Sequence, residues 1–172
     1  MTQTQSRSRT FTWDDPSITA ALAGRRPGLE LLRAMGDCEL PPPPVLALVD
    51  IERMTADEGR VVFWLRPQEF HYNPIGSVHG GVIATMLDSA AGCSVHSTLP
   101  AGVGYTTLDL SIKYLRPVTV QSGVLRAEGA VLSKGRRTAL AQAQLFEERA
   151  GDERDALVAH ATSSCLLFDM PQ

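Results

Sequence analysis

The segment that most constrains the fold lies between residues 71 and 92, where a loop rich in glycine gives way to a long apolar stretch. The loop ends in His79-Gly80-Gly81, and the stretch 82–92 that follows contains no proline. This order is typical of a loop that leads into a helix and leaves free backbone N–H groups at its first turn. Apolar residues cover every side of the predicted helix. Such a helix belongs inside a protein, so we expect the rest of the chain to surround it.

One acidic residue, Asp88, lies in the middle of this predicted helix. Burying an unpaired carboxylate costs much free energy, so Asp88 should have either a partner in the core or a chemical role. Taken alone, it fits a core carboxylate that is satisfied by the backbone or by Thr107 as well as it fits a catalytic group.

Composition and charge narrow the class of protein. The 172 residues are enough for one domain, and 44% hydrophobic and 20% charged residues are ordinary values for a globular protein. A net charge of −3 argues against a nucleic-acid partner. The sequence shows neither a signal peptide nor a membrane span, so we expect a cytoplasmic protein with no membrane partner. The scattered Cys38, Cys93 and Cys165 indicate reduced thiols.

Three regions are expected along the chain. Residues 1–16 are polar and aperiodic, which predicts a disordered tail. Residues 17–44 form the second region, an N-terminal extension with an amphipathic helix between Pro27 and Gly36, followed by a stiff proline-rich connector. Residues 45–172 form the main domain.

Six runs in the main domain have the composition or alternation of strands, and they cover residues 45–54, 60–66, 105–116, 123–133, 136–147 and 156–168. The first two should form a hairpin through a turn at residues 55–59. A tight turn is expected at Lys134-Gly135, and another at residues 150–152. This order predicts an α+β fold in which an antiparallel sheet curls around one long buried helix.

The run 105–116 alternates between apolar and polar residues. Alternation predicts two opposite faces, one with Leu108, Leu110, Ile112 and Tyr114, the other with Thr107, Asp109, Ser111 and Lys113.

A set of spaced residues resembles the motif of the PaaI-type acyl-CoA thioesterases of the hotdog-fold superfamily; the set is Asn73, Gly76, His79, Gly80, Gly81 and Asp88, with Gly135, Arg136 and Arg137 later in the chain. The resemblance covers about residues 45–168 and leaves residues 1–44 outside. It implies the hotdog fold and hydrolysis of an acyl-CoA thioester without a metal, another cofactor or a nucleophilic serine. It also implies a homodimer or homotetramer whose active sites are shared between subunits.

The chemistry of these residues agrees with thioester hydrolysis. Gly80 and Gly81 would let a carbonyl oxygen approach N–H groups at the positive end of the helix and so form an oxyanion hole. Asp88 would act as a general base on water or as a nucleophile. Asn73 would hold the lytic water or the acyl group. By resemblance, Thr107 occupies the position of a supporting hydroxyl near the carboxylate.

Several alternatives remain open. His79 fits a loop organiser better than an acid–base catalyst, and Asn73 would also suit a simple turn. A metal site built from His71, His79 and Asp88 matches no known ligand spacing and is rejected.

The basic residues and the activity also leave alternatives. The basic turn Lys134-Gly135-Arg136-Arg137 would contact CoA phosphates or be a solvated hairpin. A non-catalytic acyl-CoA-binding protein is the second function, and a hydratase or dehydratase the third. The acyl group is not specified by the sequence.

The spacing of Gly81 and Asp88 predicts a site made by two chains. Seven residues of helix separate them by about 10 Å along the axis, too far for one carbonyl group to meet both. An antiparallel second copy would solve this. The resemblance to hotdog proteins implies that the strand 105–116 pairs with its symmetry mate in such a dimer. Asn73, His79, Gly80 and Gly81 would then come from one subunit, and Asp88 and Thr107 from the other.

Overall fold

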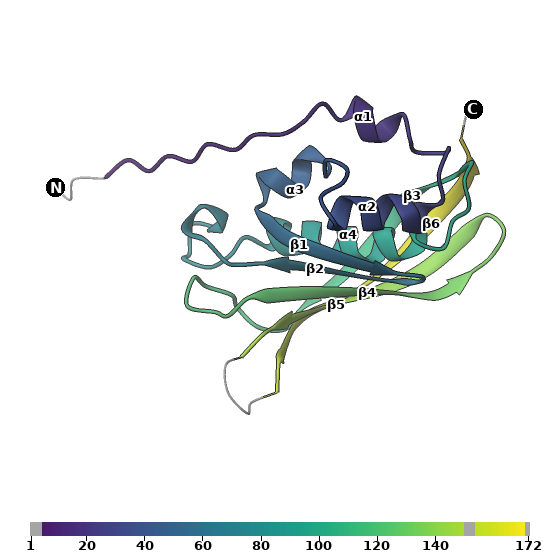
Figure 1. Cartoon of the computed structure of the whole chain (residues 1–172). Coiled ribbons are helices and arrows are strands. Elements are labelled where there is room, and N and C mark those ends of the chain that lie inside the picture. The colour runs from purple at the N-terminus through teal and green to yellow at the C-terminus, as the bar shows by residue number, and fades with distance from the viewer. Residues whose placement is uncertain (1–4, 150–153, 171–172) are drawn as a thin grey trace.

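The computed structural model describes residues 5–149 and 154–170 and shows a curled antiparallel sheet against one long helix (Figure 1). The six strands lie in the order β1-β2-β4-β5-β6-β3, and helix α4 packs against strands along the whole sheet from β2 to β3. The predicted α+β architecture is therefore confirmed. The turn predicted at residues 150–152 lies outside the described residues.

The helices and strands follow one another as the sequence order predicts. Their bounds are α1 Ser17–Ala20, α2 Gly28–Gly36, α3 Pro44–Leu48, β1 Ile51–Asp57, β2 Arg60–Leu65, the 3-10 helix η1 Glu69–His71, α4 Gly80–His96, β3 Val103–Tyr114, β4 Leu125–Lys134, β5 Thr138–Glu147 and β6 Ala156–Asp169. The helix predicted between Pro27 and Gly36 is α2.

The start of the first predicted strand is wrong. Residues 44–48 form helix α3, because Pro44 stands at the first helical turn, where proline is favoured, and Leu46 is the buried residue of the turn. Asp50, with φ of 62°, separates this helix from β1. Strand β1 also continues to Asp57, so the hairpin turn is shorter than predicted.

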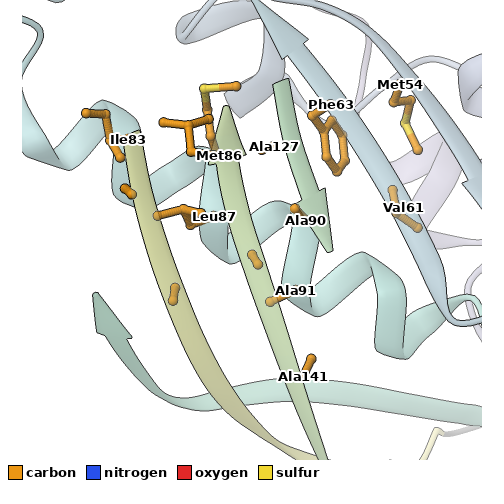
Figure 2. Packing of buried hydrophobic residues seen from close by; sticks show 14 of the residues in the cluster. Met54, Val61, Phe63, Ile83, Met86, Leu87, Ala90, Ala91, Ala127 and Ala141 are labelled. Atoms are coloured by element: carbon orange, nitrogen blue, oxygen red, sulfur yellow. The ribbon is translucent and has the colours of Figure 1, made fainter. Parts of the chain in front are cut away.

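Small residues allow the sheet to approach α4 closely. The buried strand residues include Ala127, Ala139, Ala141, Ala143 and Ala161. Figure 2 labels Ala127 and Ala141 together with the helix residues Ala90 and Ala91. At Gly129 of β4 the two backbones are so close that an added Cβ atom would lie 1.9 Å from the carbonyl oxygen of Ala90. Larger side chains such as Phe63 and Met86 fill the remaining core.

Strand β3 is an edge strand with a bulge that the alternation pattern did not predict. It pairs with β6 alone, and the register shifts between Thr107 and Asp109. Leu108 at the shift is 58% exposed, so its predicted place on the apolar face is wrong. Because the bulge inserts one residue, Thr107 before it and Leu110 after it both lie toward the core side of the strand.

The N-terminal extension packs on one side of the main domain. In α2, the Gly28 N–H donates to the Leu99 carbonyl oxygen at 3.0 Å, next to the end of α4. Upstream, the Arg9 guanidinium donates to the carbonyl of Leu48 at the end of α3 and pairs with Asp50 at 2.8 Å. Residues 5–15 thus form no helix but contact the main domain through Arg9. The division at residues 16 and 44 stays a prediction.

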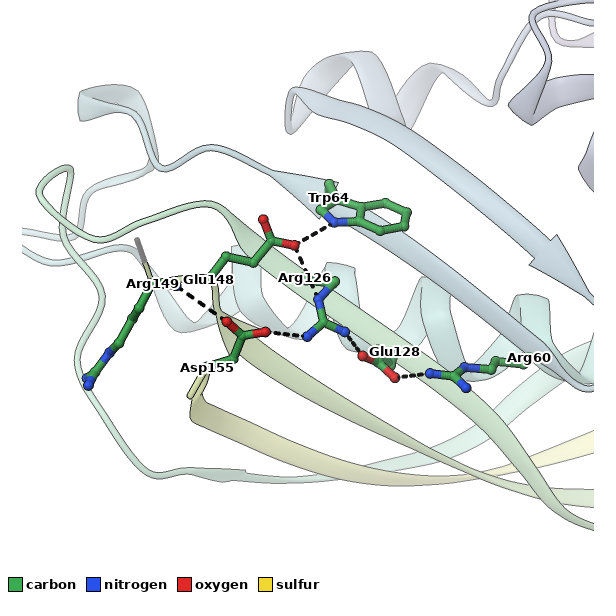
Figure 3. A network of polar contacts seen from close by, with 7 residues as sticks. All are labelled: Arg60, Trp64, Arg126, Glu128, Glu148, Arg149 and Asp155. Carbon is green, nitrogen blue, oxygen red and sulfur yellow. Dashed lines mark hydrogen bonds and ion pairs between the residues drawn. The ribbon is translucent and has the colours of Figure 1, made fainter. Parts of the chain in front are cut away.

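A charged network lies on the sheet face opposite to α4 (Figure 3). Arg126 is at its centre and pairs with Glu128, with Glu148 at 3.2 Å and with Asp155 at 2.6 Å. The hydrogen bond from Arg126 lowers the pKa of the Asp155 carboxyl. The Trp64 indole N–H also donates to Glu148 at 2.9 Å. The network therefore ties β2 and β4 to the two ends of the β5–β6 connection and leaves the helix-facing side apolar.

Two predictions about the whole chain can be compared with the fold. Cys38, Cys93 and Cys165 are free thiols, as expected. Within the described residues no helix is long and apolar enough to cross a membrane. The cytoplasmic location stays a prediction.

Candidate active site

Helix α4 begins directly after His79, whose side chain organises the first turn. The His79 Nδ1 atom accepts a hydrogen bond from the Gly81 N–H at 2.8 Å, so His79 is the N-cap residue. An added Cβ atom on Gly81 would lie 2.9 Å from Nδ1, so glycine is needed here to admit the imidazole ring. This contact fits the predicted role of His79 as a loop organiser.

The free backbone donor at this turn belongs to Gly80, which changes the expected assignment. The Gly81 N–H, expected to receive the substrate oxygen, is already bonded to His79. The Gly80 N–H has no hydrogen-bond acceptor among residues 5–149 and 154–170. Gly80 lines a surface hollow of about 540 Å³ together with Tyr114 and Arg116. The candidate oxyanion donor is therefore the Gly80 N–H.

The carboxylate of Asp88 lies two turns further along α4. It accepts a hydrogen bond from the Thr107 hydroxyl at 3.0 Å through Oδ1, so the structure brings these two predicted residues together. Its Oδ2 atom has no hydrogen-bond partner in the described part of the chain. Asp88 is partly buried in the single subunit, whereas full burial was expected. Asp88 thus has one fixed oxygen and one oxygen free to act on a water or a substrate.

The groups next to Asp88 are neutral. Burial raises the pKa of the Cys93 thiol to about 12, and the negative charge of Asp88 adds to this effect. Burial likewise raises the pKa of the Tyr105 hydroxyl well above its usual value. Neither group forms an anion near neutral pH, so neither competes with the Asp88 carboxyl group as a candidate base or nucleophile.

Asn73 is held within its own loop. Its Oδ1 atom accepts hydrogen bonds from the N–H groups of Ile75 at 3.0 Å and Ser77 at 3.2 Å, and its Nδ2 atom donates to the Ser77 hydroxyl at 2.9 Å. These bonds favour the turn alternative over a direct contact with the acyl group.

His71 is also committed to the local structure. The side chain is 3% exposed, Nδ1 accepts from the Gln68 N–H at 3.0 Å, and Nε2 bonds the Val49 carbonyl oxygen at 3.0 Å. Burial lowers the pKa of His71. Since both ring nitrogens are occupied, His71 has no free position for a metal ion. No group of three or more possible metal ligands occurs among the residues that the structure describes.

The basic turn lies at the other end of β3 from the Gly80 hollow. Lys134 donates to the Thr98 carbonyl oxygen at 2.7 Å and so fixes the turn to the segment after α4. The side chains of Arg136 and Arg137 are exposed and line a hollow of about 560 Å³ next to Val103, the first residue of β3. Within one chain, the structure therefore does not bring the arginines to Gly80.

Tyr114 is a site residue that the sequence did not indicate. Its hydroxyl donates to the Gly80 carbonyl oxygen at 3.0 Å, and its ring forms one wall of the Gly80 hollow. The alternation of β3 predicted only that Tyr114 lies on the apolar face. In the structure Tyr114 is 53% exposed at the end of β3, and its sequence pattern alone did not distinguish it from the other residues of that face.

Comparison with known proteins finds similarity to thioesterases. The family model of the thioesterase superfamily matches residues 75–153, which include the start of α4, Asp88, Thr107 and the basic turn. A proposed esterase of Halobacterium salinarum is 41% identical over 69 residues, which are 39% of this chain and 44% of that protein. The match therefore spans less than half of that relative. The human acyl-coenzyme A thioesterase 13 is 27% identical over 101 residues, or 59% of this chain and 71% of the relative.

Solved structures show the same architecture. A proposed thioesterase of Ralstonia eutropha, described as related to phenylacetic acid degradation, has a TM-score of 0.66 at 28% identity and covers 78% of this chain and 98% of its own. A Bacillus halodurans protein crystallised with CoA has a TM-score of 0.65 at 27% identity and covers 76% of this chain and 82% of its own. The curled sheet around α4 is a hotdog fold. The matched family model and these structures make the chain similar to thioesterases, in line with the resemblance of its motif.

Proposed function

We propose that this chain is an acyl-CoA thioesterase that hydrolyses an acyl-CoA thioester to a free acid and CoA. The observation that carries the proposal is a pair of groups on α4, the Gly80 N–H and the Asp88 Oδ2 atom, for which the described residues offer no hydrogen-bond partner. They are the donor and the base that thioester hydrolysis needs. Two relatives support the substrate class: one is named an acyl-coenzyme A thioesterase, and one was crystallised with CoA.

In this mechanism the thioester oxygen accepts a hydrogen bond from the Gly80 N–H at the positive end of α4. The Asp88 carboxylate takes a proton from a water molecule, whose oxygen attacks the carbonyl carbon, or it attacks the carbon itself. The tetrahedral intermediate then collapses, the C–S bond breaks, and the CoA thiolate leaves with the electron pair and takes up a proton. In the second route the acyl group is now joined to Asp88 as an anhydride, and a water molecule hydrolyses this anhydride, which releases the free acid and restores the carboxylate. The Thr107 hydroxyl orients Asp88 through Oδ1, which leaves Oδ2 for the reaction.

The proposal includes a homodimer with shared sites, or a homotetramer of such dimers. Gly80 and Asp88 are eight residues apart on α4, which corresponds to about 12 Å along the axis. Asp88 also does not line the hollow that Gly80 lines. Within one chain, one thioester cannot reach both groups.

Strand β3 offers the geometry that joins two chains. Gly80 contacts Tyr114 at the end of β3, whereas Asp88 contacts Thr107 in its first half. Since β3 is an edge strand, two copies can pair antiparallel, with the end of one strand beside the start of the other. Gly80 of the partner subunit then lies toward Asp88 of the first subunit, and one site takes its donor and its carboxylate from different chains.

The same pairing gives the basic turn a role in binding CoA. Arg136 and Arg137 lie beside Val103, so antiparallel pairing brings them to the end of the seam where the partner's α4 begins. Two exposed guanidinium groups there would bind CoA phosphates, and Lys134 and Gly135 would hold the turn in place.

A thiol-release assay against a panel of acyl-CoA thioesters tests the proposal and shows the acyl preference. Asp88→Asn is nearly isosteric, so we expect it to lower kcat by about two to four orders of magnitude and to leave the protein folded. Asp109→Asn is the matched control, because Asp109 lies two residues from Thr107 and bonds the Ser164 N–H instead. A wild-type protein that binds acyl-CoA but releases no thiol would instead be a non-catalytic binding protein.

A further inference from the structure

Tyr114 makes two contacts with Gly80, the residue that carries the free N–H. Its hydroxyl donates to the Gly80 carbonyl oxygen at 3.0 Å. Its ring also covers the Gly80 Cα, because an added Cβ atom there would lie 3.4 Å from both Cζ and the hydroxyl oxygen. Tyr114 is 53% exposed, so the core does not require a tyrosine at this position. Its contacts with the start of α4 are therefore its main structural role.

The peptide unit between Gly80 and Gly81 is held at both of its polar atoms. Tyr114 binds its carbonyl oxygen, and the Nδ1 atom of His79 binds its N–H. Two successive glycines have more conformational freedom than any other residue pair, and first helical turns fray easily. Without these two side chains, the backbone at Gly80 would therefore sample several orientations, and its N–H would lose a fixed direction.

We infer that Tyr114 is a positioning residue that fixes the direction of the Gly80 N–H for catalysis. The inference rests on the proposed function, in which this N–H receives the thioester oxygen. A donor stabilises a transition state only when it is aligned before the reaction, so a loosened turn lowers kcat more than it weakens substrate binding. Tyr114 contacts Gly80 and not the substrate, so it acts on the reaction through the direction of the Gly80 N–H.

The position of Tyr114 links this alignment to dimer formation. It is the last residue of β3, the edge strand that forms the seam in the proposed dimer. In that dimer, the side chain that binds the Gly80 carbonyl oxygen would therefore lie at the end of the seam.

Tyr114→Phe is the direct test, because it removes the hydroxyl and keeps the ring. Tyr72→Phe is the matched control: the Tyr72 hydroxyl also bonds backbone near this loop, since it accepts from the Val120 N–H at 2.8 Å, but it does not contact Gly80. We expect Tyr114→Phe to lower kcat about three- to tenfold, the usual net effect of one hydrogen bond, with KM for the acyl-CoA changed less than about twofold. Tyr72→Phe should keep the wild-type kcat.

A second measurement does not depend on activity. Hydrogen–deuterium exchange in the peptide that contains residues 79–84 should be about three- to tenfold faster in Tyr114→Phe and unchanged in Tyr72→Phe. Light scattering should show the same oligomeric state for both variants.

The outcomes separate this inference from the proposed function. Wild-type kcat together with wild-type exchange in Tyr114→Phe would overturn the positioning role. An equal loss of kcat in both variants, or a loss explained by dissociation of the oligomer, would also overturn it. If the wild-type protein releases no thiol from any acyl-CoA, the proposed function fails, and faster exchange in Tyr114→Phe would still show that Tyr114 orders the first turn.

Discussion

Replacing Gly80 by proline removes the proposed oxyanion donor and changes little else. Gly80 is the first residue of α4, the position where proline is most favoured in helices. The preceding His79 has φ of −62° and ψ of 134°, a conformation that a residue before proline prefers. The added Cβ atom would make ordinary van der Waals contact with the Tyr114 ring at 3.4 Å. The substitution therefore replaces one N–H by a ring carbon without forcing the backbone to move.

The expected size of the effect follows from this geometry. Loss of one oxyanion donor costs about 10²- to 10³-fold in kcat, or about 2.7–4 kcal/mol of transition-state stabilisation. The free energy of unfolding should stay the same or rise by about 0.4–1 kcal/mol, because proline restricts the unfolded chain. Thiol release and thermal unfolding measure the two quantities. A Gly80→Pro protein with wild-type kcat would show that the Gly80 N–H is not the donor.

The same variant tests whether one site uses two chains. Gly80→Pro and Asp88→Ala damage opposite halves of each shared site, so a hybrid dimer contains one intact site and one site with both defects. Random mixing gives hybrids in about half of the dimers, and the mixture should recover about one quarter of the wild-type activity per chain. Differently tagged subunits allow the hybrid to be purified. A hybrid as inactive as its parents would refute the shared site and require each chain to complete its own.

Three further predictions concern binding, pH and packing. Changing both Arg136 and Arg137 to alanine should raise KM for CoA esters about tenfold with little change in kcat. The kinetics of thioesters without the nucleotide should be unaffected. An equal loss of activity with both substrate types would indicate a structural role. Burial lowers the pKa of His71 below 6.5, so the unfolded chain takes up the proton first as the pH falls below about 6.5. The wild type should therefore lose thermal stability between pH 7.5 and 5.5, and His71→Gln should lose less over that range; equal pH slopes would contradict this cause. Gly129→Ala places a Cβ atom 1.9 Å from a helix carbonyl oxygen, so denaturant unfolding should show a free energy of unfolding lower by about 1–3 kcal/mol. Gly135→Ala is the control and should leave this free energy nearly unchanged, because its Cβ atom would be 3.5 Å from its nearest neighbour.

The elements with long, regular patterns could be predicted from the sequence. The buried helix α4, the helix α2 and five of the six strands lie within a few residues of their predicted bounds. The exception, residues 44–48, is a short apolar run, and such runs fit a helix turn and a strand equally well by periodicity. Pro44 favours a first helical turn, and the contact of Leu46 with the core, which involves residues distant in the chain, adds to this preference.

The bulge in β3 could not be predicted for a similar reason. Alternation reports which residues are buried, whereas a bulge depends on the register with β6. The pattern therefore placed Leu108 on the wrong face. Thr107 was expected near Asp88 by resemblance, and the structure confirms their contact at 3.0 Å.

The site shows the same limit at the level of single hydrogen bonds. Residue types predicted the loop and the carboxylate as a candidate site. They did not predict that the Gly81 N–H is bonded to the imidazole of His79, which leaves the Gly80 N–H as the candidate donor. Which of two adjacent N–H groups is free depends on one side-chain rotamer, and no sequence pattern records this. Tyr114 was missed because its partner, the Gly80 carbonyl, is 34 residues away in the chain.

The hydrogen bonds of the loop also limit how the chemistry can proceed. Asn73 and His71 use their side chains to hold the loop, and His79 uses Nδ1 to cap α4. A serine–histidine pathway would need a histidine that accepts a proton from a nearby hydroxyl, and the structure shows no such pair among the described residues. The reactive groups left are the Gly80 N–H and the free oxygen of Asp88. Both lie on one helix, about 12 Å apart along its axis. In the proposed dimer, α4 would therefore supply its first turn to one site and Asp88 to the other, and the substrate would bind between the two helices.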